Sequence, residues 1–200
     1  MEDFKIFDKW STKGIKPNDV GLEKYINLEP RLVPHSGGRD AKKQFHKSKM
    51  NIVERLMNKM QVPGHHGKKH VMTSGRASGK THVHYKIIQK VFERIEQQTK
   101  KNPLEILVKA VENSAPREEI TQYQLGGIML RRAVITSPQR RVDLALSNIV
   151  QASYKKSFGK KDTIVDSLTA EIVGAYNNDG QKSEAVKEKE RLERESEGAR

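Results

Sequence analysis

The chain has 200 residues, of which 38 are lysine or arginine and 25 are aspartate or glutamate, so its formal net charge is +13 at pH 7. Such a surplus repels itself, and it indicates a polyanionic partner first and an anionic membrane surface second. The chain contains no cysteine, which excludes disulfides and thiolate metal sites and is typical of a reducing cytosol. No apolar run reaches the ~18–20 residues of a membrane-spanning helix.

Residues 1–47 are expected to form an irregular N-terminal arm. Prolines and glycines separate two small apolar clusters, one around Trp10 and one around Tyr25. These clusters are too small to fold alone, so the arm should dock on a larger body. The arm turns basic after residue 38, and its candidate nucleic-acid contacts are Arg39, Lys42, Lys43 and Lys47.

Residues 48–180 are expected to form a helical body. Apolar residues recur at helical spacing in several segments, and start signals precede some of them, such as Asn102-Pro103. The predicted helices cover about 48–60 with Ser48 as cap, 80–101, 103–115, 138–158 and 163–176. Residues 181–200 form a densely charged tail, for which a helix is marginal without a partner.

A β-hairpin is predicted at about 117–137. Two runs rich in β-branched and aromatic residues flank Gly126-Gly127, a typical two-residue turn. Ser137-Pro138 then reads as a helix N-cap and first residue, which places Arg140 and Arg141 in the first turn. Two arginines are unfavourable at a helix N-terminus unless an anion binds there, so the pair favours a phosphate contact over two solvated side chains.

Together these elements predict a mainly α fold: a bundle of about six helices with a protruding β-hairpin and an irregular N-terminal arm. The two hundred residues are organised as the arm 1–47, the body 48–180 and the charged tail 181–200. Lysines and arginines spread over several loops suit the binding of a folded polyanion.

Two motifs suggest nucleotide binding and metal binding, but neither has the spacing that these functions require. Gly79-Lys80-Thr81 resembles a nucleotide-binding loop, but Ser74 stands where the loop needs glycine and no apolar strand precedes it. The histidines between residues 65 and 84 match no zinc spacing. No nucleophile, base and acid set stands out, so we expect no enzyme activity, no catalytic residue, no cofactor and no metal.

In several segments the chain resembles a known family, the universal S-seven family of small-subunit ribosomal proteins. The most specific segments are PRE at 116–118, GG at 126–127 and SPQRRVDLAL at 137–146. FDKWS at 7–11, LVPHSGGR at 32–39 and IVERLMNKM at 52–60 are similar to the archaeal and eukaryotic branch. The similarity covers nearly the whole chain.

The resemblance implies a structural constituent of the small ribosomal subunit in the cytoplasm. Family members bind small-subunit rRNA directly in its 3′ major domain and nucleate assembly of the subunit head. They lie at the exit site, where the hairpin approaches mRNA and exit-site tRNA, and they contact neighbouring small-subunit proteins. No membrane partner is implied. A general nucleic-acid-binding, chromosomal protein remains the alternative.

Charge pattern and resemblance together predict a set of RNA-binding residues. They are Arg39, Lys42, Lys43, Lys47, Arg76, Gly79, Lys80, Arg117, Gly126, Gly127, Arg131, Arg132, Arg140, Arg141, Lys155, Lys156, Lys160 and Lys161. The chain departs from the family at Thr81, where members commonly have lysine, and in its tail, which is richer in acid than the family's usual basic end.

Overall fold

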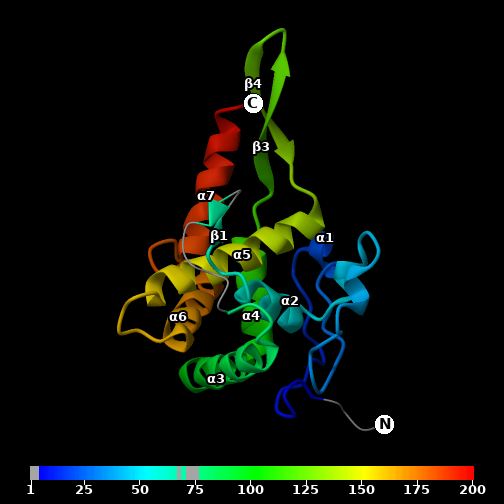
Figure 1. Ribbon diagram of the computed structural model, residues 1–200, viewed down its shortest axis with the longest axis vertical. Helices are drawn as coiled ribbons and strands as arrows, with labels where there is room; N and C mark the ends of the chain where they lie inside the picture. Colours follow the sequence, from blue (N-terminus) through cyan, green and yellow to red (C-terminus); the bar gives the residue numbers. More distant parts are fainter. Residues whose placement is uncertain (1–4, 67–68, 71–76) are drawn as a thin grey trace.

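The computed structural model describes residues 5–66, 69–70 and 77–200. These residues form a mainly helical body from which a two-stranded hairpin protrudes (Figure 1), so the predicted fold class is confirmed. The helices are α1 (Val20–Glu23), α2 (Ile52–Met60), α3 (Thr81–Thr99), α4 (Pro103–Ser114), α5 (Pro138–Ser157), α6 (Ile164–Tyr176) and α7 (Glu184–Glu197), and the 3-10 turns are η1 (Arg39–Ala41) and η2 (His46–Lys49). No helix among them is long and apolar enough to cross a membrane.

The hairpin pairs β3 (Glu118–Leu125) with β4 (Ile128–Ile135) in an antiparallel register from Glu118↔Ile135 to Leu125↔Ile128. Gly126 and Gly127 have φ angles of 56° and 89°. Two successive positive φ values are what a two-residue hairpin turn of type I′ requires, and glycine adopts them without strain. A second, very short pair, β1 (His65–His66) and β2 (Lys69–His70), lies in the loop before α3.

Side-chain caps set several helix starts. Asn102 accepts a hydrogen bond from the Leu104 N–H at 3.0 Å at the start of α4, as its sequence signature predicts. The predicted start at Ser48 is wrong. Asn51 caps α2 by accepting from the Val53 N–H at 2.9 Å, and its own segment pairs with Asn27 of the arm. Met50 and Asn51 are extended at this bridge, between the 3-10 turn η2 and α2, so the α-helix begins only at Ile52.

The first part of the arm packs against α3 through aromatic side chains. The ring centroids of Phe7 and Trp10 lie 5.9 Å and 5.5 Å from that of Phe92, nearly perpendicular to it. The Trp10 indole N–H donates to Glu96 Oε2 at 3.1 Å. Edge-to-face aromatic contacts of this kind add to the burial energy, so the arm's small apolar cluster completes the core of the helical body.

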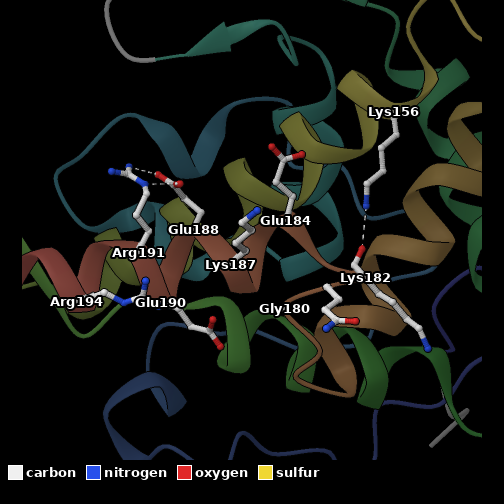
Figure 2. A pocket seen from close by; sticks show the side chains of 10 residues that line it. Lys156, Gly180, Lys182, Glu184, Lys187, Glu188, Glu190, Arg191 and Arg194 are labelled. Atoms are coloured by element: carbon white, nitrogen blue, oxygen red, sulfur yellow. Dashed lines mark hydrogen bonds and ion pairs between the residues drawn. The ribbon is translucent and has the colours of Figure 1, made fainter.

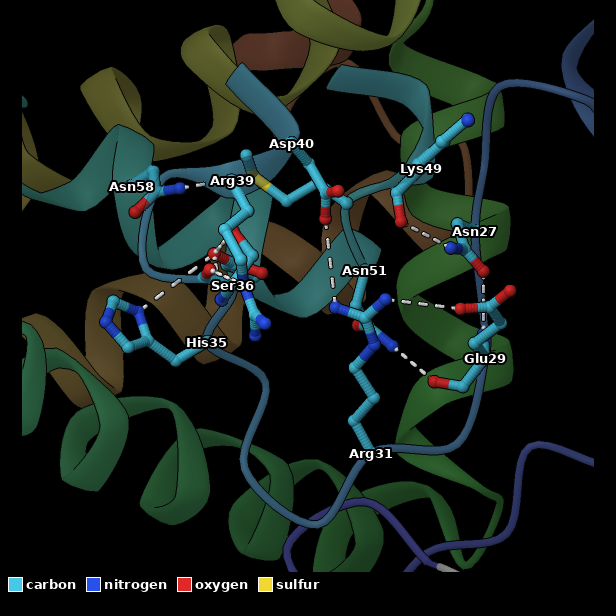
Figure 3. A network of polar contacts seen from close by, with 12 residues as sticks. Asn27, Glu29, Arg31, His35, Ser36, Arg39, Asp40, Lys49, Asn51 and Asn58 are labelled. Atoms are coloured by element: carbon cyan, nitrogen blue, oxygen red, sulfur yellow. Dashed lines mark hydrogen bonds and ion pairs between the residues drawn. The ribbon is translucent and has the colours of Figure 1, made fainter. Parts of the chain in front are cut away.

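The second part of the arm docks on α2 through polar contacts, which Figure 3 shows. Glu54 is buried, and one of its oxygens accepts from both the backbone N–H and the hydroxyl of Ser36, each at 2.7 Å. The Asn51 side-chain amide donates to the Glu29 carbonyl at 2.9 Å, while the Arg31 guanidinium contacts the carboxylates of Glu29 and Asp40. The irregular backbone is thereby held by side chains instead of by a helix or sheet.

The charged tail forms α7, which runs beside β3 toward the hairpin tip (Figure 1). Its start is buried at Ala185 and Val186. Farther along, Glu193 accepts a hydrogen bond from the Arg117 N–H at 3.1 Å at the base of the hairpin. The helix that is marginal alone is stabilised here by packing on the body and on β3.

Candidate nucleic-acid interface

The two arginines in the first turn of α5 are each paired with a carboxylate. Arg140 makes a bidentate contact with Glu119, with its Nε 2.7 and 2.9 Å from the two carboxylate oxygens and its Nη2 2.8 Å from one of them. This hydrogen bonding raises the pKa of Arg140. Arg141 donates to Asp19 Oδ2 at 2.8 Å and holds the pKa of Asp19 below its usual range.

These pairs give the arginines a structural role. Arg140 ties the base of the hairpin to α5, and Arg141, whose side chain is 12% exposed, ties the arm to the same turn. The partner acids are 21 and 122 residues away in sequence, so no local pattern reveals them. Ser137 occupies the N-cap position without making a side-chain cap hydrogen bond. Phosphate binding by the two arginines stays a prediction.

The basic end of α5 is likewise paired. Lys155 contacts Glu184 at 2.7 Å, and Lys156 contacts the fully buried carboxylate of Glu171 at 2.6 Å. Lys156 also donates to the Lys182 carbonyl at 2.9 Å (Figure 2). A groove of about 860 Å³ lies here, and both signs of charge line it, as Figure 2 shows for the α7 side chains. A mixed lining of this kind is poorly suited to a polyanion.

Other predicted cations are exposed and form no ion pair within the described residues. They are Lys42, Lys43, Lys80, Arg117, Arg131, Arg132, Lys160 and Lys161. Of the remainder, Arg39 is exposed and donates its Nε–H to the Ser36 carbonyl, Lys47 pairs with Asp143 at 2.8 Å, and Arg76 lies outside the described residues.

The unpaired cations lie in separated places on the molecule. The loop of Lys42 and Lys43 adjoins the start of α5, and Lys160 and Lys161 follow its end. A 20-residue helix spans about 30 Å, so a ligand that contacts both groups must be long. A folded RNA meets that requirement, and a small anion does not.

Two glycines predicted to bind RNA have clear backbone roles. Gly79 has a φ of 74°, and its N–H donates to the side chain of Gln61 at 3.3 Å, which closes the loop before α3. Gly127 shapes the hairpin tip described above. At that tip Leu125 and Ile128 are each 66% exposed, and Arg131 and Arg132 stand on the same strand, β4, nearer the body. The tip is thus apolar, and β4 carries two exposed arginines between the tip and the body.

No three histidine or acidic side chains come together as a metal-binding group in the part of the chain that the structure describes. The buried histidine of α3, His84, has its Nε2 3.1 Å from the Ala77 carbonyl and serves the packing of the helix start.

Comparison with known proteins shows that the chain is similar to ribosomal proteins. The family described as Ribosomal protein S7p/S5e matches residues 22–200. The chain is 47% identical to small ribosomal subunit protein uS7 of Nanoarchaeum equitans over 98% of each chain. It is 48% identical to the protein of the same name from Methanothermobacter thermautotrophicus, over 94% of this chain and 95% of the relative.

A third relative, small ribosomal subunit protein uS7 of Archaeoglobus fulgidus, is 42% identical over all of this chain and 96% of its own length. These relatives match 94–100% of the chain, and the family model covers residues 22–200, which include most of the arm and all of the acid-rich tail. The chain therefore belongs to the ribosomal protein S7p/S5e family.

Proposed function

We propose that this protein binds small-subunit rRNA through the unpaired cations that flank α5 and line the shaft of the hairpin. It is a structural constituent of the small ribosomal subunit, as the names of its relatives and its family state. As a component of the ribosome, the protein is located in the cytoplasm. Its partners are rRNA and other ribosomal proteins.

The observation that carries the proposal is the division among the basic residues. Those that the structure pairs with acids, such as Arg141 and Lys156, hold the molecule together. Those left unpaired, such as Lys42 and Lys160, project from loops at opposite ends of one long helix. Exposed and unpaired cations are available to neutralise phosphates, because no internal carboxylate has to be displaced.

The finer assignment follows the same logic. We infer binding to the 3′ major domain, where the protein nucleates assembly of the subunit head, and a position at the exit site. The hairpin extends beyond the helices, and its exposed tip reaches toward the path of mRNA and exit-site tRNA, beside neighbouring small-subunit proteins. The shape of the molecule supports this placement, since a protruding ribbon can contact a partner that the body does not touch.

A salt titration tests the role of the cations. Lys42→Gln with Lys43→Gln, and separately Lys160→Gln with Lys161→Gln, should each weaken binding to small-subunit rRNA. Each pair should also reduce the dependence of log K on log salt by up to about two units, about 0.9 per lost phosphate contact. The measurement is filter binding at several salt concentrations.

The matched control removes the same charge from the acid-rich helix α7, by Lys187→Gln with Lys189→Gln. This variant should keep the wild-type slope. If both loop variants also keep the slope, the loops do not contact phosphates. If the wild-type protein binds duplex DNA as tightly as folded rRNA, a general chromosomal protein is the better description.

A register-preserving deletion tests the hairpin. Removing Gln124, Leu125, Ile128 and Met129 keeps the glycine turn and joins it to the next cross-strand pair, Tyr123↔Leu130. All four side chains are exposed, so folding and rRNA affinity should stay unchanged. Binding of deacylated tRNA to the exit site of reconstituted subunits should weaken. A tenfold loss of rRNA affinity would instead place the tip on rRNA.

A further inference from the structure

An open pocket of about 430 Å³ lies between the loop before α2 and the first turns of α5. Its lining includes Phe45, Lys59, Gln139, Arg140 and Asp143. Pockets of 300–1,000 Å³ are the size that accommodates a small organic group such as a nucleotide. Three features of the residues that line this pocket suit a bound nucleotide.

The first feature is the phenyl ring of Phe45. The side chain is 64% exposed, and the backbone has a φ of 64°, a left-handed conformation that bulky residues rarely adopt. The loop around it is basic, with Lys42, Lys43 and Lys47 within three residues. An exposed aromatic face among cations is the usual arrangement for stacking an unpaired base.

The second feature is the ammonium group of Lys59. Burial lowers the pKa of Lys59, although the nearby charge of Asp143 opposes the effect. Asp143 is already engaged, with one oxygen 3.1 Å from Arg55 Nη2 and the other 2.8 Å from Lys47 Nζ. Within the described ranges Lys59 forms no ion pair of its own. A phosphate in the pocket would supply the missing anion.

The third feature is the side-chain amide of Gln139. Its Oε1 atom is buried and has no hydrogen-bond partner. A buried acceptor without a donor costs free energy, and the exocyclic amino group of a base is a suitable donor.

We propose that this pocket binds a single unstacked nucleotide of the rRNA. The base stacks on Phe45, its amino edge donates to Gln139 Oε1, and its phosphate contacts Lys59. The inference rests on the proposed rRNA binding and goes beyond it, because it assigns the protein a preference for a looped or bulged nucleotide over a continuous duplex.

The test uses the full chain and transcribed small-subunit rRNA. Phe45→Leu keeps the apolar bulk and removes the aromatic face, so rRNA affinity should fall by about fivefold to a hundredfold or more, the range measured for loss of one stacked base. Phe45→Trp should retain the affinity. Its emission should be quenched by rRNA, against the constant background of the buried Trp10.

Salt dependence separates stacking from charge. Phe45→Leu should leave the salt slope unchanged, since no cation is lost, whereas Lys59→Gln should reduce it by about one unit. The control is Phe158→Leu at the other end of α5, an aromatic residue that is 49% exposed, which should keep the wild-type affinity. Urea unfolding of each variant verifies that folding is intact.

The outcomes distinguish the two proposals. Tight rRNA binding by wild type together with wild-type affinity and slope in Phe45→Leu and Lys59→Gln would overturn the nucleotide pocket alone. Failure of the wild-type protein to prefer rRNA over duplex DNA would overturn the proposed function first. Equal losses in Phe45→Leu and Phe158→Leu would show a general effect of exposed aromatics and would also overturn the pocket.

Discussion

Removal of the Asp143 carboxylate should be among the most destabilising single changes in this protein. Asp143 on α5 holds Arg55 of α2, whose side chain is only 1% exposed, at 3.1 Å. The other end of the Arg55 guanidinium donates to the Tyr25 carbonyl at 2.8 Å. One buried cation thus joins two helices and the arm, and Asp143 is the only acid in an ion pair with it among the described residues.

The size of the loss in the free energy of unfolding depends on which cation is left without a partner after the substitution. After Asp143→Ala, Lys47 can turn to water, because its side chain is 39% exposed. The guanidinium of Arg55 cannot turn to water, and an uncompensated buried charge of this kind costs about 3–5 kcal/mol. A typical domain has only about 5–15 kcal/mol of stability, so the variant should lose a large share of its free energy of unfolding.

Urea unfolding followed by circular dichroism measures the effect, and a double-mutant cycle isolates it. Arg55→Met removes the buried charge while keeping an apolar side chain in its place, and it leaves Asp143 paired with Lys47. The double variant should therefore be more stable than Asp143→Ala alone, by at least about 2 kcal/mol.

Two results would refute this reasoning. A loss below about 1 kcal/mol in Asp143→Ala would mean that the Arg55 guanidinium reaches water once its partner is gone. A double variant no more stable than Asp143→Ala would mean that the carboxylate acts through packing and not through the buried charge.

The other predictions concern pH, the end of α5 and the hairpin turn. The pKa of Asp143 is lowered: burial acts to raise it, but the hydrogen bond from Lys47 and the neighbouring cations outweigh that effect. Its contribution to stability is therefore complete above the ordinary pKa of 3.8 and is lost as pH falls further through the folded-state pKa. Urea midpoints should decline below about pH 4, and less steeply in Asp143→Asn. Lys156→Met should cost about 3–5 kcal/mol in urea unfolding because it leaves the buried Glu171 without its cation, whereas Lys160→Met should change stability by less than about 0.5 kcal/mol. Gly127→Val should strain the turn at its φ of 89° and broaden the amide NMR signals of the tip, while the signals of α4 stay unchanged.

The sequence was a sufficient guide wherever the determining interactions are local. The Asn102-Pro103 signature predicts the start of α4 because the cap is made within two residues. Gly126-Gly127 predicts the hairpin turn because only glycine adopts two successive positive φ values without strain. Composition and the motif at 137–146 likewise indicated a cationic RNA-binding protein of the family that the comparisons show.

Local patterns could not show which cations remain available, because that depends on acids brought close by the fold. The sequence predicts a phosphate contact for Arg141, which stays a prediction, but it could not show the ion pair that joins Arg141 to Asp19 across 122 residues. The sequence predicts Ser48 as the N-cap of α2. The structure has Asn51 as the cap, at the residue that pairs with Asn27 of the arm.

By itself, the sequence determined the start of α4, the glycine turn and the surplus of positive charge, since each depends on the residues present or on residues near one another in the chain. Only the tertiary structure decided how that charge is divided between internal ion pairs and exposed loops. It also decided that Phe45 and Lys59 line one pocket. The physical reason is that ion pairing and burial depend on distances in space, which a linear pattern does not contain.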